Sequence, residues 1–197
     1  MNTIPYDEAA RVIGHGDLLL KRGTWWHPVD AAIMTAGRSR YVHAAMAACE
    51  RIGSSGFVVG FRCVEITQFH GGRMRPLRAV VAQEPGRWDV FTTNPERRRS
   101  EFDPAEAVKT MKRFAGTPYG WRNLVGTGLM HLPVVRWLVR ADLDDEAQPR
   151  HPPFCSQAVA IACRAGGVDP VPNLADRLTE PGDLARSPFF RYRFTLV

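Results

Sequence analysis

Cysteine is scarce and unpatterned in this sequence. The four cysteines, Cys49, Cys63, Cys155 and Cys163, include no C-x-x-C pair, so a disulfide framework is not expected. The histidines show neither an H-E-x-x-H motif nor the spacing of paired Cys/His ligands, which argues against a zinc site. We therefore expect no metal and no other cofactor.

The sequence also has no long apolar run. Its most apolar segment, residues 124–139, is shorter than the roughly 20 residues that a bilayer requires, and it contains His131, Pro133 and Arg136. The first residues have neither the basic region nor the apolar region of a secretory signal. We therefore expect no transmembrane segment and a cytoplasmic protein, or a virion-associated one if a phage encodes it.

Lysine is rare among the cationic residues. The chain has three lysines and 23 arginines, and its net charge is +6. Arginine favours flat, bidentate contacts with carboxylate or phosphate, but here the excess is scattered, and the one dense run, 97–99, has Glu96 and Glu101 beside it. Because scattered positive charge gives only non-specific attraction, we expect no specific nucleic-acid partner.

Short apolar runs separated by turn residues dominate the first half of the chain. They recur about every ten residues, which predicts a meandering, mostly antiparallel sheet. The 197 residues suit one domain with a proper core, without repeats or low-complexity tracts. The predicted strands are residues 16–20, 41–48, 57–61, 62–68, 77–81 and 87–91, with a last strand at 191–197.

Three helices are predicted from their start and stop signals. Residues 29–36 end at Gly37, and residues 104–114 begin with Pro104 at the first helical position and stop before Gly116. Cys155–Ala165 is small and apolar and ends at a double glycine, 166–167. Strands followed by helices predict an α+β protein.

Cys155 is the best candidate nucleophile among the cysteines. It follows two prolines and Phe154 at the predicted first turn of a helix, where backbone N–H groups and the positive end of the macrodipole favour a thiolate. The alternative is a buried structural cysteine, which is the commonest fate of a free thiol. Cys49 and Cys163 lie in apolar surroundings and are interpreted as core residues.

A nucleophilic cysteine needs a base and a third group that orients the base. His43 is the best candidate base, because it lies in a short apolar run where packing would hold an inward-facing ring. Glu65 alternates with Val64 and Ile66 on a nearby predicted strand, so adjacent antiparallel strands would bring its carboxylate to His43. The alternatives are a satisfied core histidine and a solvent-facing glutamate.

Five short segments follow one another in a recognisable order: GDLLL at 16–20, SRYVHAA at 39–45, GTPYGW at 116–121, FCSQAVA at 154–160 and PGDLA at 181–185. The ordered set resembles the circularly permuted branch of the NlpC-type papain-like cysteine hydrolases, often called YiiX-like. In that branch the histidine strand precedes the cysteine helix, and His43, Glu65 and Cys155 follow this order. The resemblance covers nearly the whole chain.

The resemblance implies a fold and a set of roles. The fold would be a permuted papain-like α+β domain over residues 1–197, with an antiparallel sheet packed against helices and a helical, hydrophobic insertion around 103–150. Cys155 would be the nucleophile, His43 the base and Glu65 the residue that orients His43. Tyr119 would hydrogen-bond near the sulfur, and Gln157, where many relatives have an acidic residue, would contact substrate.

The implied activity is hydrolysis of an amide bond through a thioester, with a cell-wall (peptidoglycan) peptide as the substrate and no cofactor. One alternative is a lipid or thioester acyl hydrolase or acyltransferase, in which residues 124–139 with Trp121 and Trp137 line an acyl channel or touch a membrane. A core hairpin is the favoured interpretation of that segment. The other alternative is a non-catalytic component of a phage tail or similar assembly, such as a virion.

Overall fold

A computed structural model of the chain describes residues 2–52, 57–94, 102–120, 152–172 and 174–197. Within these residues one seven-stranded sheet has the order β1-β7-β6-β2-β3-β4-β5. Its strands are β1 (Thr3–Ile4), β2 (Leu18–Arg22), β3 (Tyr41–Ile52), β4 (Phe57–Thr67), β5 (Gly71–Pro76), β6 (Trp88–Thr93) and β7 (Phe190–Leu196). The helices are α1 (Tyr6–Ala9), α2 (Pro28–Ala36), α3 (Leu77–Gln83), α4 (Pro104–Arg113), α7 (Cys155–Ala165) and α8 (Pro181–Arg186), with a 3₁₀ turn at Asp176–Leu178.

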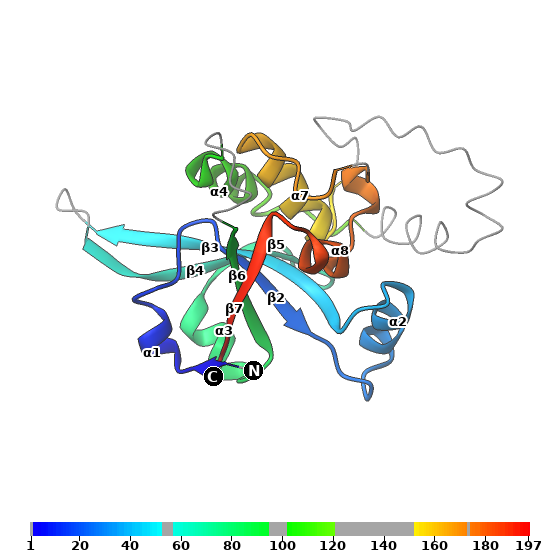
Figure 1. Cartoon of the computed structure of the whole chain (residues 1–197), viewed down its shortest axis with the longest axis horizontal. Coiled ribbons are helices and arrows are strands. Elements are labelled where there is room, and N and C mark those ends of the chain that lie inside the picture. Colours follow the sequence, from blue (N-terminus) through cyan, green and yellow to red (C-terminus); the bar gives the residue numbers. More distant parts are fainter. Residues whose placement is uncertain (1, 53–56, 95–101, 121–151, 173) are drawn as a thin grey trace.

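The sheet is antiparallel at every pairing except β1 with β7, which run parallel. Thr3 lies opposite Thr195 in that parallel pair, so the two ends of the chain lie side by side (Figure 1). The mostly antiparallel sheet predicted from the apolar runs is therefore present, and the mixed α+β class is confirmed.

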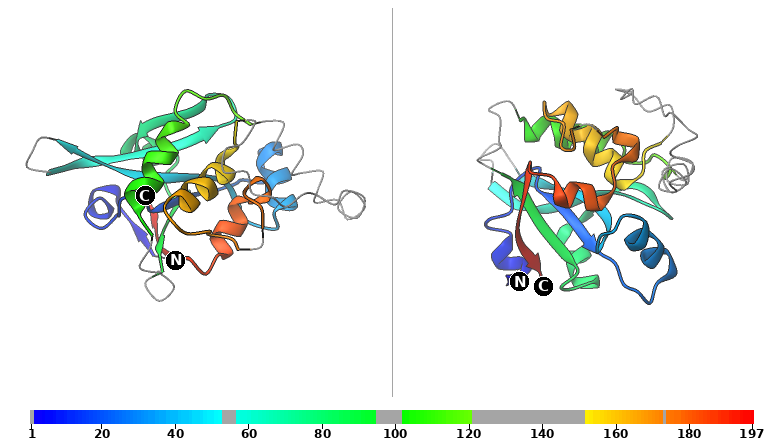
Figure 2. Two further views of the ribbon diagram at one scale, coloured as in Figure 1. Left: turned by 90° about the horizontal axis from the view of Figure 1, so that it is seen from above. Right: turned by 45° about the vertical axis from the view of Figure 1, so that its right-hand side comes forward.

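Each face of the sheet carries its own core. Helices α4, α7 and α8 lie over one face, and α1 and α3 lie over the other (Figures 1 and 2). Because side chains of a strand alternate between faces, the alanines of β3 divide between the two cores. Ala44 and Met46 pack under α7, and Ala45 and Ala47 pack on the side of α3.

Helix α7 lies close against β3 because both contribute small side chains at the contact. Ala158 and Ala162 of the helix and Ala44 and Ala48 of the strand belong to one fully buried cluster. Alanine favours helices over strands, but here pairing with β2 and β4 keeps these alanines extended. The result is that the first residue of α7 lies beside the start of β3.

One predicted strand is wrong. Residues 77–81 form the helix α3 (Leu77–Gln83) and not a strand. Leu77, Val80 and Val81 are its buried residues, and this spacing of three and four is the helical pattern. The apolar run was short enough to fit either structure, and the helical spacing decides it.

Three further elements differ from expectation. The predicted strands 57–61 and 62–68 are one strand, β4. Strand β5 and helix α8 were not predicted. The predicted helices 29–36, 104–114 and Cys155–Ala165 are present as α2, α4 and α7.

The predicted insertion around 103–150 is described only in its first part. There α4 buries Ala107, Val108 and Met111 in the same core as α7, so this part is a core helix. The apolar segment 124–139, with Trp121 and Trp137, lies outside the described residues. Among the helices that the structure describes, none has the length and apolar character needed to cross a membrane.

Candidate active site

Cys155 is the first residue of α7, with Phe154 as its N-cap. Its side chain is buried, and the helix N-terminus places the positive end of the macrodipole at the sulfur. The backbone N–H groups of Ala44, on β3, and Ser156 hydrogen-bond to the sulfur. The thiol is therefore surrounded by donors that favour its ionised form.

His43 lies next to Cys155 at the start of β3. Its imidazole hydrogen-bonds to the sulfur of Cys155 on one side, and its Nε2 lies 3.0 Å from Oε2 of Glu65 on the other. The ring makes a T-shaped contact with Trp88, with the ring centroids 5.9 Å apart. Packing and two polar partners thus fix the orientation of the imidazole.

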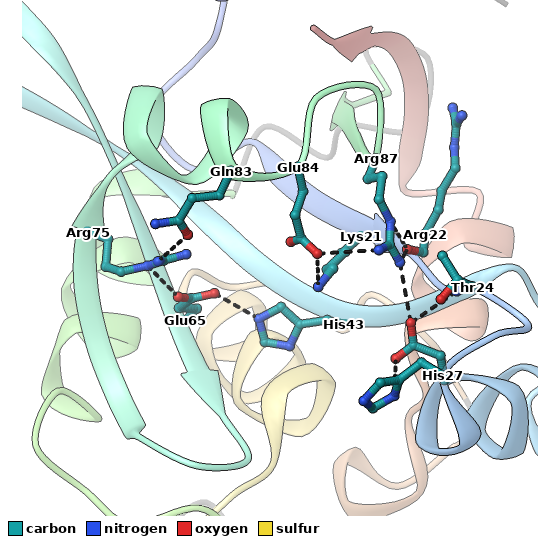
Figure 3. Close-up of polar contacts among 11 residues, drawn as sticks. Lys21, Arg22, Thr24, His27, His43, Glu65, Arg75, Gln83, Glu84 and Arg87 are labelled. Atoms are coloured by element: carbon teal, nitrogen blue, oxygen red, sulfur yellow. Dashed lines mark hydrogen bonds and ion pairs between the residues drawn. The ribbon is translucent and has the colours of Figure 1, made fainter.

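Glu65 is held in place by two arginines as well as by His43. It lies on β4, opposite Ala45 of β3 and Arg73 of β5. Its Oε1 accepts from Nε of Arg73 at 2.9 Å and from Nε of Arg75 at 3.1 Å. Figure 3 shows Glu65 between Arg75 and His43. Arg75 in turn donates to Gln83 of α3 at 2.9 Å.

The surroundings shift the pKa values of these three groups in a consistent way. Burial raises the pKa of Cys155, but the His43 imidazolium and the backbone N–H groups outweigh it, so the thiol pKa lies below its ordinary value. Burial lowers the pKa of His43, but the Cys155 thiolate and the Glu65 carboxylate raise it to about 9. Burial likewise raises the pKa of Glu65, and His43, Arg73 and Arg75 bring it down to about 2.

The other thiols with shifted pKa values move in the opposite direction. Burial raises the pKa of Cys63 well above its ordinary value, and the nearby Glu65 adds to this. Burial and two aspartates raise the pKa of Cys163. All four cysteines are free thiols, and Cys155 alone among these three has a lowered pKa.

Tyr119 reaches the sulfur from the segment that follows α4. Its buried hydroxyl hydrogen-bonds to Cys155 and to Gln68, and burial together with the nearby thiolate raises its pKa. Gln157 is buried within the first turn of α7. It is not among the residues that line the cavities beside Cys155, and its role in substrate binding stays a prediction.

Two cavities of about 420 Å³ each meet at Cys155. Ile33, Val42, Tyr119 and Cys155 line both. The first, called the apolar cavity below, lies against α2 and includes Val29, Ala32, Ala36 and Phe154. The second, called the polar cavity, is lined by His43 and by charged side chains that include Lys21, Asp30, Arg73, Glu84 and Arg87.

Ion pairs fix the charged side chains of the polar cavity (Figure 3). Glu84 lies 2.8 Å from Lys21 and 3.3 Å from Arg87, and Arg87 lies 3.3 Å from Asp30. Asp30 also accepts from the backbone N–H of Thr24 at 3.0 Å. This part of the cavity wall is therefore lined by charged side chains that are paired with one another.

The remaining described histidines do not contact the sulfur in the way that His43 does. His15 accepts from the backbone N–H of Cys49 at 3.0 Å. Cys49 lies six residues after His43 on β3. His27 and His70 are exposed residues that line the polar cavity. His131 and His151 lie outside the described residues.

Arg73, Arg75 and Gln68 belong to the site but were not singled out in the sequence. Arg73 and Arg75 are two residues apart on β5, and this period of two is the signal of a strand face. Recognising 71–76 as a strand paired with β4 would have placed both beside Glu65.

The side chains of the site form a hydrogen-bonded relay from Cys155 through His43 to Glu65. In the part of the chain that the structure describes, no three or more His, Cys, Asp or Glu side chains are grouped so as to hold a metal ion. Chemically, the arrangement supplies a thiol with a lowered pKa, an imidazole with a raised pKa beside it and a carboxylate that holds the imidazole.

The fold and the site together define an α+β protein with a buried cysteine–histidine–glutamate relay at the N-terminus of a core helix. No protein-family model matches the chain, and comparison with curated proteins finds no match either. Among solved structures, the fold is similar to the crystal structure of the metalloprotein YiiX from Escherichia coli O157:H7, described as DUF1105. The sequences are 15% identical, the TM-score is 0.59, and the match covers 92% of this chain and 96% of that one.

This likeness concerns the fold. It agrees with the YiiX-like fold that the five ordered segments predict, and it extends over nearly the whole chain.

Proposed function

We propose that this protein is a cysteine hydrolase that cleaves an amide bond, with Cys155 as the nucleophile, His43 as the acid and base and Glu65 as the residue that orients His43. The observation that carries the proposal is the buried relay itself. A thiol with a lowered pKa hydrogen-bonds to a histidine whose pKa is about 9, and that histidine lies 3.0 Å from a buried carboxylate. Reactive thiols in enzymes have these surroundings.

The reaction would run in two steps. The Cys155 thiolate attacks the carbonyl carbon, the C–S bond forms and the C–N bond breaks, while His43 gives its proton to the leaving nitrogen. Water then attacks the thioester, and its proton passes to His43. The C–S bond breaks, the acid leaves and the thiolate–imidazolium pair is restored.

The helix N-terminus supports the negative charge that develops on the carbonyl oxygen. The backbone N–H of Cys155, at the first position of α7, is the proposed donor to this oxyanion. One such donor typically lowers the barrier by about 3–4 kcal/mol. Tyr119 hydrogen-bonds to the sulfur and would help to fix the position of the sulfur.

The proposed architecture is the circularly permuted papain-like one. The order His43, Glu65, Cys155 along the chain, the strand position of His43 and Glu65 and the helix start at Cys155 support it. The likeness to YiiX supports it at the level of the fold.

YiiX is described as a metalloprotein, which raises the question of whether this site fits a metal. The Glu65 carboxylate already accepts from His43, Arg73 and Arg75. His43 lies between Glu65 and Cys155, so the three groups do not converge on one point. The residues do not fit a metal ion, and the proposed mechanism uses none.

A cell-wall peptide is the substrate that the family resemblance implies, and it stays a prediction. The apolar cavity favours the acyl-hydrolase alternative over a plain peptidase, because its lining offers hydrocarbon contacts beside the nucleophile. In an acyltransferase, an amine or alcohol would take the place of the water.

The proposal is tested with a panel of acyl p-nitroanilides that includes short peptides and simple acyl groups. We expect p-nitroaniline release by the wild-type protein and its loss in Cys155→Ala and His43→Ala. Matched controls are Cys163→Ala and His15→Ala, which should retain activity because neither side chain lines the two cavities.

Activity that survives His43→Ala but is lost in His70→Ala would show that the base is wrong. Activity that survives Cys155→Ala would contradict the mechanism. Absence of p-nitroaniline release from every probe would instead favour the non-catalytic alternative.

A further inference from the structure

The two cavities that meet at Cys155 differ in chemistry. The polar cavity holds fixed ion pairs, such as Lys21 with Glu84 and Arg87 with Asp30. The apolar cavity is walled by α2, through Val29, Ala32 and Ala36. A substrate whose scissile carbonyl lies at the sulfur would therefore have one polar side and one hydrocarbon side.

The polar atoms in the wall of the apolar cavity already have partners. Ser156 donates its hydroxyl to the carbonyl of Thr179 at 2.8 Å, and the Glu180 side chain accepts from a backbone N–H in the capping box of α8. The Tyr119 hydroxyl bonds to Cys155 and Gln68. A peptide would bring its own N–H and C=O groups into this space, and burying such groups without partners is costly. A hydrocarbon chain brings none.

Two large aromatic side chains are exposed directly before the helix that walls the cavity. Trp25 is 70% exposed and Trp26 is 96% exposed, and α2 begins two residues later at Pro28. Exposed tryptophans suit a boundary between water and hydrocarbon, because the ring is apolar and its N–H is polar. This is a second, independent observation that points to an amphiphilic substrate.

We propose that the apolar cavity binds an unbranched acyl chain, and that the polar cavity receives the polar amine released from it. This assignment rests on the proposed function, and it names the substrate class as an N-acyl amine or N-acyl amino acid. The C–N bond that breaks joins the two parts at Cys155. The released acid keeps the chain, and the released amine takes the proton of His43.

The first test measures alkylation of Cys155 by N-alkyl iodoacetamides of increasing chain length. In this reaction the thiolate forms a C–S bond and iodide leaves, so no turnover is needed. We expect the second-order rate constant to rise about threefold to fourfold for each added methylene until the cavity is full. Mass mapping identifies the labelled cysteine.

Variants of the apolar cavity test whether the dependence of the alkylation rate on chain length arises there. Ala32→Phe and Ala36→Phe, which fill the apolar cavity, should flatten the dependence on chain length. Ala82→Phe is the matched control, because Ala82 is exposed on α3 and lines neither cavity. It should keep the wild-type dependence.

A rate that is the same for methyl and dodecyl probes would overturn the acyl-chain assignment while leaving Cys155 as a nucleophile. A Cys155 that no probe labels would contradict the proposed function instead. In that case, calorimetric titration of Cys155→Ala with N-dodecanoylglycine decides the cavity. Saturable binding that Ala32→Phe abolishes supports the assignment, and absence of binding overturns it.

Release of p-nitroaniline also tests whether the acyl substrate comes from solution or from a lipid surface. Dodecanoyl p-nitroanilide, in which the acyl C–N bond is the one that releases p-nitroaniline, is presented as a monomer or in vesicles of neutral phospholipid. If the tryptophans contact a lipid surface, Trp26→Ala slows only the vesicle reaction. If it slows both equally, the chain is taken from solution and the surface contact is contradicted.

Discussion

His43 sets the pH range over which the proposed chemistry can run. The Cys155 thiolate and Glu65 hold its pKa at about 9 against the effect of burial. The thiol beside it has a lowered pKa, so the thiolate and the imidazolium coexist between the two values. This pair is the reactive form of a cysteine hydrolase.

The pH profile of kcat/KM should therefore be bell-shaped. It should fall above about pH 9, where His43 loses the proton that the leaving group needs. Its acidic limb should lie below the ordinary thiol value of about 8.5. Steady-state kinetics from acidic to alkaline pH measure both limbs, and a profile that keeps rising through pH 9 would contradict the role of His43.

Glu65→Gln should keep the fold and lower kcat/KM by about tenfold or more, whereas His43→Ala should lower it by about 100-fold or more. The alkaline limb should also move to lower pH in Glu65→Gln, because the carboxylate no longer stabilises the imidazolium. A drop in kcat/KM with an unmoved limb would mean that Glu65 acts only as a structural residue.

Glu65 should also contribute to stability in a pH-dependent way. Its pKa in the folded protein is about 2, below its ordinary value, so its ion pairs stabilise the fold above the ordinary value. This contribution is lost as the pH falls toward about 2. At neutral pH the wild type should be more stable than Glu65→Gln by roughly 2–3 kcal/mol.

Urea unfolding at several pH values measures this difference, which should shrink as the pH falls below about 4. Glu50→Gln is the control, since exposed Glu50 pairs with Arg62 on the same two strands and its loss should leave stability nearly unchanged. A difference that persists undiminished at low pH would contradict the pairing of Glu65.

For single residues, the sequence pointed to the three members of the relay but not to the arginines that hold Glu65 in place. Cys155 and His43 stand in short motifs, and Glu65 was singled out because it alternates with apolar residues on a predicted strand. Arg73 and Arg75 have no motif, and they reach Glu65 only because β5 pairs with β4 in one register. Long-range pairing of this kind is not encoded in a local pattern.

At the scale of elements, the start of β5 positions the segment that carries Tyr119. The N–H of Gly72 donates to the carbonyl of Thr117 at 2.8 Å, and the N–H of Gly116 donates to the carbonyl of Gly72 at 2.8 Å. A Cβ at Gly72 would lie 1.8 Å from the carbonyl oxygen of Phe114. Only glycine allows the two segments to come this close.

Gly72→Ala should therefore push the 114–119 segment away and weaken the contact between Tyr119 and Cys155. We expect a loss of about 1–3 kcal/mol in the free energy of unfolding and slower alkylation of Cys155. Urea unfolding and labelling kinetics measure the two effects. Gly60→Ala is the control, because a Cβ there meets nothing within 4 Å, and equal behaviour of the two variants would contradict this account.

The elements also show where local patterns are ambiguous. The short run at 77–81 predicted a strand, yet its buried residues follow the helical spacing of α3. The alanine-rich β3 could have been a helix by propensity, and its neighbours on both sides make it a strand. Context decides such runs, and a single sequence shows little of that context.

At the scale of the whole molecule, a buried carboxylate ties the C-terminal strand β7 to the middle of the sheet. Asp89 on β6 is fully buried and accepts from Arg22 of β2 at 2.9 Å, from Tyr41 of β3 at 2.7 Å and from Thr195 of β7 at 2.7 Å. Four strands thus share one charge network, and Tyr41 begins the strand that carries His43.

Asp89→Ala should cost about 3–5 kcal/mol, because it leaves Arg22 without its buried partner. Thermal and urea unfolding measure the loss. Asp7→Ala is the control, since Asp7 and Arg78 form a pair that is mostly exposed and contributes little. Asp89→Asn keeps some acceptors and should lie between the two, whereas equal stability of Asp89→Ala and Asp7→Ala would contradict the network's role.

The central claim, that Cys155 is an activated nucleophile, is tested most directly by labelling the native protein with limiting iodoacetamide at about pH 6–7 and mapping all four cysteines. A lowered pKa at Cys155 and raised pKa values at Cys63 and Cys163 predict that Cys155 is alkylated first. His43→Ala should remove this preference, and denaturation in urea should make the four rates similar. Preferential labelling of Cys49 or Cys63 in the native protein would contradict the account.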